Sequence, residues 1–323
     1  MSSHDLLEIS SLSVAYQGRP VLDGIDLTIA PGETVGLVGE SGAGKSTLAW
    51  AVLGLARPSA GRIVFDGQDI TRAGRRGRRL LSSSLQMVFQ DPYSSLNPAR
   101  RIGDALAEPL LHRRDLSRAD RTRLVEESLR RVGLPGDAAQ RFPAHFSGGQ
   151  RQRIAIARAL VGSPRLVICD EPVTALDLSV QAQIINLLAE LQSELGLSYL
   201  LTAHDLAVVR HLAHRVVVLH RGRVVESGPT DVVWTRPAHP YTRALLAAAP
   251  VTDPVAARAA AAAREAVFST TVGSAPPESA GGCAYAHRCA FAEARCRVER
   301  PVPTPTPDGT VVACLRQDEL PAR

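Results

Sequence analysis

The chain has 323 residues, 45% of them hydrophobic, and its 37 basic and 32 acidic residues give a net charge of +5. This composition excludes global disorder, and the mild charge favours a soluble protein with no nucleic-acid partner. No apolar run approaches the ~18 to 20 residues that span a bilayer, and the first residues, MSSHDLLEIS, are unlike a signal peptide. We therefore expect a cytoplasmic protein that would meet a membrane only as a peripheral subunit.

Strands and helices alternate along most of the chain. Helical periodicity runs through residues 101–161, and residues 180–195 form an amphipathic helix between two later strands. The basic run RAGRRGRR (72–79) is interpreted as a solvated loop. This alternation predicts an α/β fold with a parallel sheet and a helical insertion. Apolar segments with turn signals predict the strands, at residues 6–16, 21–29, 34–39, 62–70, 85–90, 165–171, 197–205 and 215–228.

The composition changes toward the end of the chain. Residues 256–263 are rich in alanine, residues 273–282 are rich in Gly, Ser and Pro, and RPVPTPTPDG occupies 300–309. Such segments are typical of chain that forms little regular structure. We predict a C-terminal extension over residues 236–323 that follows a folded domain over residues 1–235.

The segment GESGAGKST (39–47) fits the phosphate-binding loop pattern, because a predicted strand precedes it and a predicted helix follows it. Its glycines let backbone amides point at a β-phosphate, and the helix N-terminus adds positive potential. Lys45, the only lysine in the chain, would reach the β- and γ-phosphates, and Ser46 would offer its hydroxyl to Mg²⁺. The predicted nucleotide contacts in this loop are Gly39, Ser41, Gly42, Ala43, Gly44, Lys45, Ser46 and Thr47.

Two later segments also carry chemistry. LVICDE (166–171) is an apolar strand that ends in two carboxylates. Asp170 would hold Mg²⁺, and Glu171 would act as the general base toward the attacking water. An acidic pair alone could be ordinary surface chemistry, but a phosphate loop upstream favours the catalytic interpretation. FSGGQRQRIAIARAL (146–160) opens a predicted helix with Ser-Gly-Gly, which indicates a second anion site.

With these motifs in this order, residues 6 to about 235 resemble an ATP-binding subunit of an ABC transporter. The FSGGQ segment matches the signature of that family, with Phe146 in place of the usual Leu. The resemblance implies a P-loop NTPase fold of the ABC ATPase type. Such a fold has a mixed sheet core, an antiparallel β subdomain and a helical subdomain, here at about residues 92–164.

The resemblance also assigns roles to single residues. It places an adenine-stacking aromatic at Tyr16. It also places the Q-loop glutamine at Gln90, and this residue would contact the γ-phosphate and Mg²⁺ and face the membrane subunit. TALD (174–177) matches the D-loop, and His204 matches the switch histidine that contacts the γ-phosphate. The catalytic residues implied are therefore Glu171, Gln90 and His204, with Mg²⁺ held by Ser46, Gln90 and Asp170.

In this family two ATP-binding domains pair head to tail. The segment Ser147, Gly148, Gly149 and Gln150 of one chain would then close over the γ-phosphate of the ATP bound by the other. The implied partners are a second ATP-binding subunit, identical or homologous, and two membrane permease subunits. An extracytoplasmic peptide-binding protein would act through the same complex. The implied location is peripheral, at the cytoplasmic face of the cell membrane.

Three further stretches resemble the importers of dipeptides and oligopeptides within this family. They are DPYSSLNPARRIGDALAEPL (91–110), RVGLPGDAAQRFPAHFSGGQRQR (131–153) and RPAHPYTRALLAAAP (236–250), which GCAYAHRC (282–289) follows. The function implied is a Mg-dependent ATPase that powers peptide import. The alternatives are an ATPase for nickel or another small solute, a soluble ABC ATPase with no transport role, and a non-hydrolysing regulatory module.

The chain has five cysteines. Cys169 lies in a predicted strand and is interpreted as a small core residue. The other four are separated by five, six and seventeen residues, and a cytoplasmic setting disfavours disulfides between them. The spacing lacks the short Cys-x-x-Cys pairs of zinc sites, whereas four thiolates suit a four-iron cluster, which some of the resembled importers carry. Zinc and free thiols stay as alternatives, and His287 is interpreted as a surface residue. The four are Cys283, Cys289, Cys296 and Cys314.

Overall fold

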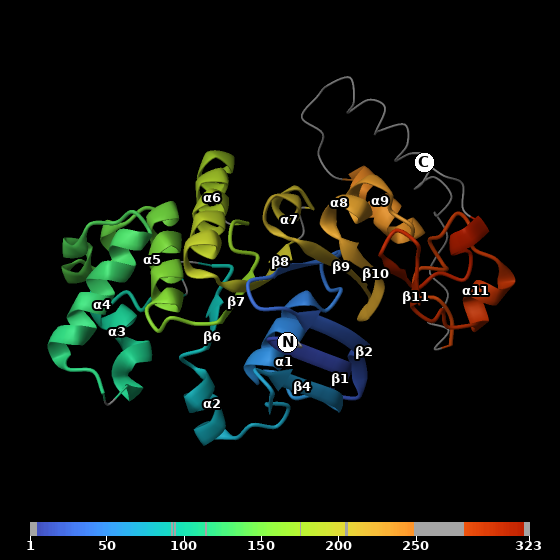
Figure 1. The fold of residues 1–323 in the computed structure, drawn as a ribbon. Coiled ribbons are helices and arrows are strands. Elements are labelled where there is room, and N and C mark those ends of the chain that lie inside the picture. The colour runs from blue at the N-terminus through green and yellow to red at the C-terminus, as the bar shows by residue number, and fades with distance from the viewer. Residues whose placement is uncertain are drawn as a thin grey trace.

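The structure, a computed structural model, has a central sheet with helices on one side and a smaller sheet on the other (Figure 1). None of the helices in the described part of the chain is long and apolar enough to cross a bilayer. The residues described are 5–91, 93, 95–113, 115–174, 176–203, 206–248 and 281–319.

The central sheet has eight strands in the order β11-β12-β10-β9-β3-β8-β7-β6. The five consecutive strands from β9 to β6, which is the last strand at one side of the sheet, are parallel. They appear in the sequence as unbroken apolar runs because both faces of the sheet are covered. Because β3 and β7 are parallel and both pair with β8, the segments that follow them meet at one edge of the sheet. The parallel strands are β6 (Leu85–Val88), β7 (Leu166–Asp170), β8 (Ser198–Ala203), β3 (Thr34–Val38) and β9 (Arg215–His220).

A second sheet of four antiparallel strands, in the order β2-β1-β4-β5, forms the antiparallel subdomain. Helix α1 (Lys45–Leu53) lies between the two sheets, and its apolar side chains belong to the core that joins them. This burial on several sides explains why α1 shows no polar face in the sequence. The strands are β1 (Leu7–Tyr16), β2 (Arg19–Ile29), β4 (Ala60–Phe65) and β5 (Gln68–Asp69).

The other face of the central sheet shares a core with the helical subdomain (Figure 1). In that subdomain Ser117 and Asp120 form a reciprocal capping box that starts α4. The helices are α3 (Ile102–Ala107), η1 (Glu108–His112), α4 (Arg118–Arg131), η2 (Gly136–Gln140), η3 (Pro143–His145) and α5 (Gly148–Leu160), and α6 (Leu178–Leu195) and α7 (Leu206–Leu212) follow in the chain. The mixed sheet, the antiparallel sheet and the helical subdomain together confirm the predicted fold class.

The composition of the basic run 72–79 predicted a loop, and this prediction was wrong because helix α2 (Arg75–Leu81) begins within the run. The Arg78 guanidinium donates to the carbonyl of Val52 in the last turn of α1, at 2.8 Å, and to the carbonyl of Ile70, at 2.7 Å. Burial lowers the pKa of Arg78. The prediction was wrong at this residue because the carbonyls at the end of α1 need donors, and one arginine of the run supplies them.

The C-terminal part of the chain packs onto one end of the central sheet (Figure 1). Strand β12 pairs antiparallel with β10, with Val312 opposite Glu226, and β11 pairs with β12. The extension therefore adds two short strands to the main sheet, and most of its described residues lie outside helices and strands. Residues 256–263 lie outside the described residues. The remaining elements are β10 (Arg223–Pro229), α8 (Thr230–Thr235), α9 (Pro240–Ala248), α11 (Ala294–Val298), β11 (Thr304–Pro305), β12 (Val311–Val312) and η4 (Gln317–Glu319).

Candidate nucleotide-binding site

The phosphate loop connects the end of β3 to the start of α1. Gly39, Gly42 and Gly44 have φ angles of 155°, 78° and 106°. The φ of Gly44 favours glycine, and a Cβ there would also lie 3.1 Å from the Val21 carbonyl oxygen, where the β1–β2 hairpin packs against the loop. Gly44 also has no side chain to cap α1, which leaves the amides of the first turn for a ligand. All predicted loop contacts, Gly39, Ser41, Gly42, Ala43, Gly44, Lys45, Ser46 and Thr47, lie in this strand–loop–helix connection.

Lys45 crosses the loop and is only 6% exposed. Its Nζ donates to the carbonyl of Gly39 at 2.8 Å and to that of Glu40 at 3.2 Å, and lies 3.9 Å from Glu171 Oε1. Burial lowers the pKa of Lys45, while the nearby carboxylates of Glu171 and Asp170 act in the opposite direction. The ammonium is thus held between the loop and the acidic pair at the end of β7.

Asp170 is the last residue of β7 and is almost fully buried. Its Oδ1 accepts from Ser46 Oγ at 3.1 Å and from Thr202 Oγ1 at 2.6 Å. Hydroxyl and carboxylate oxygens are the donors that Mg²⁺ prefers, so Ser46 and Asp170 fit such an ion. Sequence reasoning missed Thr202, which lies opposite Asp170 on neighbouring strand β8. Its signal was a polar residue within the apolar strand LSYLLTAHD.

Glu171 follows β7 with a φ of +47°, a left-handed conformation that is costly for a residue with a Cβ. Its amide donates to the Thr202 carbonyl and hydroxyl oxygens, both at 3.1 Å, which holds this backbone in place. Its Oε2 accepts from Gln90 Nε2 and from Thr174 Oγ1, both at 3.2 Å. The Q-loop glutamine, the acidic pair and the loop lysine are therefore brought together at one edge of the sheet.

The signature segment begins helix α5 in the helical subdomain. Ser147 is the N-cap, and it exchanges hydrogen bonds with Gln150, Ser147 N to Gln150 Oε1 at 3.0 Å and Gln150 N to Ser147 Oγ at 3.4 Å. A Cβ on Gly149 would lie 2.5 Å from Val180 Cγ1, so α6 requires glycine there, and Gly148 faces Tyr93. Among the described residues, no hydrogen bond or ion pair joins this segment to the phosphate loop of the same chain.

Two predicted nucleotide contacts remain, Tyr16 and His204. Tyr16 is the last residue of β1 and is 45% exposed, so its ring is open to a ligand. His204 lies outside the described residues, as does Ala175 of the D-loop.

The four tail cysteines line one pocket of about 20 Å³, together with His239, Tyr285 and Phe291. Burial raises the pKa of Cys289 to about 11 and also raises the pKa of Cys283 and of Cys314, which favours neutral thiols. Across the described ranges, no group of three or more His, Cys, Asp or Glu residues is arranged to hold a metal ion. The residue types suit a metal cluster, but this volume holds about one water molecule and the arrangement does not fit one.

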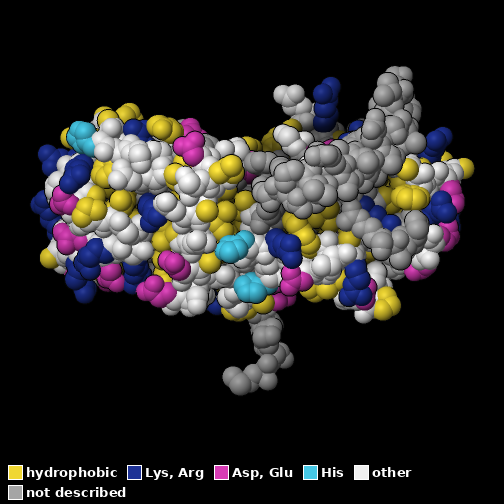
Figure 2. All heavy atoms as spheres, turned by 90° about the horizontal axis from the view of Figure 1, so that it is seen from above, with side chains coloured by type: hydrophobic (Ala, Val, Ile, Leu, Met, Phe, Trp, Pro, Cys, Tyr) yellow, Lys and Arg dark blue, Asp and Glu magenta, His cyan; other side chains and the backbone are white. Residues whose placement is uncertain are grey.

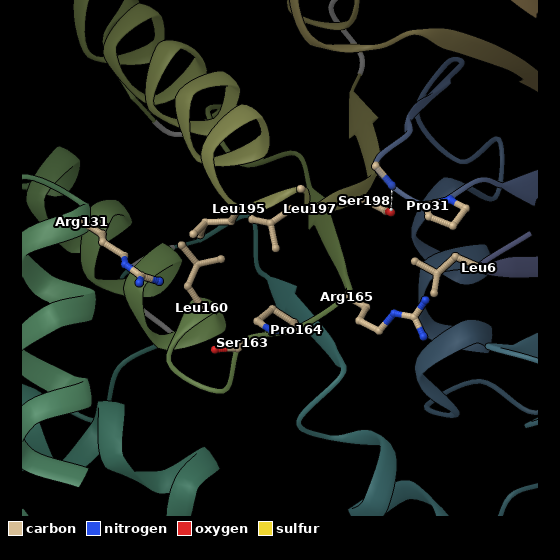
Figure 3. A pocket seen from close by; sticks show the side chains of 12 residues that line it. Leu6, Pro31, Arg131, Leu160, Ser163, Pro164, Arg165, Leu195, Leu197 and Ser198 are labelled. Carbon is tan, nitrogen blue, oxygen red and sulfur yellow. Dashed lines mark hydrogen bonds between the residues drawn. The ribbon is translucent and has the colours of Figure 1, made fainter. Parts of the chain in front are cut away.

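A second pocket, of about 280 Å³, lies at the ends of the parallel strands that are opposite to the phosphate loop (Figure 3). Leu197 and Ser198 line it where β8 begins, and Pro164 and Arg165 line it just before β7, whereas Asp170 ends β7. This pocket is therefore separate from the phosphate loop.

A phosphate loop whose lysine faces a strand-end acidic pair, on this three-part fold, defines an ATP-binding P-loop protein of the ABC type. The ABC transporter family matches residues 22–174, and the family described as "Oligopeptide/dipeptide transporter, C-terminal region" matches residues 225–296. A "Probable peptide ABC transporter ATP-binding protein" of Sinorhizobium fredii is 47% identical, with 97% of this chain and 90% of that protein covered. A "Di/tripeptide transport ATP-binding protein" of Pseudomonas aeruginosa is 45% identical, with 87% of this chain and 85% of that protein covered.

Solved structures agree with this assignment. The protein cbiO1 of Clostridium perfringens, part of an ABC transporter complex, is similar with a TM-score of 0.65 and 33% identity, over 71% of this chain and 90% of that one. The ATP-binding cassette MJ0796, in a dimeric post-hydrolysis state with ADP and Pi, is similar with a TM-score of 0.63 and 28% identity, over 69% of this chain and 98% of that one. The chain belongs to the ABC transporter family, among its peptide-transport ATP-binding proteins.

Proposed function

We propose that this chain is the Mg-dependent ATPase subunit that powers import of di- and oligopeptides through separate permease subunits. The observation that carries the proposal is the meeting of Lys45, Ser46, Asp170 and Glu171 at one edge of the sheet. The peptide substrate is supported by the match of residues 225–296 and by the two relatives, both described as peptide-transport ATP-binding proteins.

Each residue of this site has a distinct task. The loop amides and Lys45 bind the β- and γ-phosphates, and Ser46, Asp170 and Gln90 hold Mg²⁺. Bound MgATP supplies the phosphoryl group that is transferred to water. Glu171 orients that water and accepts its proton, and the hydrogen bonds from Gln90 and Thr174 aim the Glu171 carboxylate.

The second phosphate contact comes from another ATP-binding subunit. Residues Ser147, Gly148, Gly149 and Gln150 of one chain close over the γ-phosphate of the ATP bound by its partner. In the chain that binds this ATP, Tyr16 stacks on the adenine and His204 contacts the γ-phosphate. The helix N-terminus at Ser147 and the dimeric state of MJ0796 support this arrangement. In a homodimer, mixing a Lys45→Ala chain with a Ser147→Arg chain leaves one intact composite site, so ATPase activity should recover in part.

The chain works at the cytoplasmic face of the cell membrane as a peripheral subunit. Its partners are two permease subunits, and a peptide-binding protein outside the membrane delivers the substrate to them. Exposed Phe89 and Tyr93, which flank the Q-loop, support contact with an apolar surface of the permease. Basic and acidic side chains are interspersed on the face shown in Figure 2, which supports the absence of a nucleic-acid partner.

The domain division proposed is an ABC domain over residues 1–235, with its helical subdomain at about 92–164, and an extension over 236–323. A four-iron cluster at the four tail cysteines stays a prediction. The shared pocket supports it, while the pocket's volume opposes it, and no catalytic step involves it. Metal analysis of anaerobically purified protein decides the matter, because four irons per chain support the cluster and one zinc or no metal overturns it.

One experiment separates the proposed function from its alternatives. The full chain is tagged and isolated with its natural partners from solubilised membranes, and the molecular mass of the intact complex is measured. We expect two ATP-binding and two permease subunits, with ATP hydrolysis that depends on peptide and its binding protein. Stimulation by nickel instead of peptide contradicts the substrate, and a chain that carries no hydrophobic partner contradicts the transport role.

A further inference from the structure

Among the described residues, Glu40 is the phosphate-loop residue whose hydrogen bonds and ion pair reach the C-terminal extension. Glu40 lies between Gly39 and Ser41, and its carbonyl already accepts from Lys45 Nζ at 3.2 Å. Its two other polar groups, the amide and the carboxylate, bind residues more than 200 positions later in the chain. The extension thus reaches the loop that cradles the phosphates.

The first of these contacts is Tyr241, on helix α9. Its hydroxyl accepts from the Glu40 amide at 2.9 Å, so this loop amide is occupied by the extension. Tyr241 is 1% exposed and packs against the rings of His220 and Tyr285, with centroids 4.2 Å and 5.3 Å away. A side chain held on two sides by other rings has little freedom, so its hydroxyl is a fixed point for the loop backbone.

The second contact is Arg288, one residue before Cys289. Its Nη1 lies 3.0 Å and 3.1 Å from the two carboxylate oxygens of Glu40. The guanidinium also lies over the ring of Tyr285, 5.9 Å from its centroid, so both contacts belong to one cluster. Arg288 balances the one negative side chain of the loop, which would otherwise repel the triphosphate.

We infer that Tyr241 and Arg288 are positioning residues for the phosphate loop, through which the C-terminal extension sets the affinity of the site for MgATP. Neither residue is placed against the nucleotide. They act through Glu40. Because Lys45 Nζ donates to the Glu40 carbonyl, a shift of Glu40 moves the lysine that binds the phosphates. The inference rests on the proposed function, because it concerns the same ATP site.

The test measures binding of a fluorescent ATP analogue, with Mg²⁺, to the full chain and to single variants. Arg288→Ala leaves the Glu40 carboxylate without this counter-charge, and Tyr241→Phe keeps the ring packing but removes the hydroxyl acceptor. We expect each to weaken binding about 3- to 10-fold, the range of a partly exposed charge pair or one hydrogen bond. Arg288→Lys should stay within about 2-fold of wild type, because one nitrogen makes both contacts with Glu40.

Arg300→Ala is the matched control. Arg300 also joins the extension to the domain, by an ion pair with Asp23 at 3.2 Å, but it does not contact the phosphate loop. A general loosening of the extension would affect this variant as much as Arg288→Ala. We expect Arg300→Ala to bind the analogue within about 2-fold of wild type.

A double-mutant cycle identifies Glu40 as the intermediary. In a Glu40→Gln background, Arg288→Ala should cause no further loss of binding, because the charge that Arg288 balances is gone. If wild-type protein does not bind the analogue, the proposed function fails. If wild type binds it, and both Arg288→Ala and Tyr241→Phe behave like Arg300→Ala, the proposed function stands and this inference is overturned. Thermal unfolding of Tyr241→Phe, expected within a few degrees of wild type, separates positioning from loss of fold.

Discussion

The nucleotide site and the cysteine pocket both contain several ionisable side chains, but the first holds charged groups with partners and the second favours neutral groups. At the nucleotide site, Lys45 and Glu171 lie 3.9 Å apart, and hydroxyl groups donate to Asp170, so charged forms are already balanced before a ligand arrives. In the cysteine pocket, burial raises the pKa of Cys289 to about 11, so the thiol stays neutral. The first site is prepared for a charged ligand, and the second would need a bound cation to hold thiolates.

The strongest test of the prepared site is Glu171→Gln, which removes the base but keeps a side chain of the same shape. We expect turnover to fall by about 10²–10⁴-fold while ATP binding persists. Glu190→Gln, on the exposed face of α6, is the control and should hydrolyse ATP like wild type. Steady-state hydrolysis and nucleotide binding are measured on the assembled complex, and near-normal turnover of the Glu171 variant would remove Glu171 from the role of base.

Thr202→Val sharpens the comparison, because it keeps the shape of the side chain and removes a hydrogen bond from buried Asp170. We expect a loss of about 1–3 kcal/mol in the free energy of unfolding, the cost of leaving a buried carboxylate short of a donor. Denaturant unfolding measures this loss. Titration of hydrolysis with Mg²⁺ should show weaker Mg²⁺ binding, so that a higher Mg²⁺ concentration is needed for the half-maximal rate. Thr122→Val, at an exposed position of α4, is the control, and equal effects of the two variants contradict the role of Thr202.

Cys289→Ser tests the neutral pocket. A slightly more polar hydroxyl in this apolar lining should lower the free energy of unfolding by about 1 kcal/mol. Nucleotide binding should stay within about 2-fold of wild type, because the substitution changes neither the loop nor the acidic pair. If nucleotide affinity falls by tenfold or more, Cys289 affects the nucleotide site, and the two sites are not independent.

The smallest expected effect is a pH dependence from His220. Burial, with Arg221, Arg288 and His287 nearby, lowers the pKa of His220 to about 3. Between pH 6.5 and 3 the unfolded chain therefore binds a proton that the folded chain does not, so stability falls as the pH falls. The His220 share is about 0.7 kcal/mol from pH 7 to pH 6. His220→Phe should lose that share in denaturant unfolding at the two pH values, and an unchanged slope contradicts it.

The central motifs were predictable because each is contiguous. A strand, a glycine-rich loop and a helix N-terminus position Lys45 and Ser46 with little help from the rest of the chain, and the carboxylates of Asp170 and Glu171 follow directly from the end of one strand. Parallel pairing then brings the two segments to one edge of the sheet. These parts of the site depend mainly on local sequence, so pattern alone indicates them.

The contacts that sequence analysis missed join distant segments. Thr202 reaches Asp170 only because β7 and β8 pair in one register, and the Arg78 guanidinium finds the end of α1 only after α2 has formed. The link from Tyr241 to Glu40 spans 201 positions. No local periodicity encodes such pairs, because packing between elements determines which polar groups meet.

The pairing of β12 with β10 has a consequence for how the chain can be divided. Without residues 311–312, the unpaired amides and carbonyls on one side of β10 become an open sheet edge, the kind of surface on which chains aggregate. In the intact chain the outermost strand is β11, which has two residues, one of them Pro305. A short strand with proline is a poor template for further pairing. The extension therefore protects the sheet against self-association, and a fragment ending at residue 235 lacks that protection.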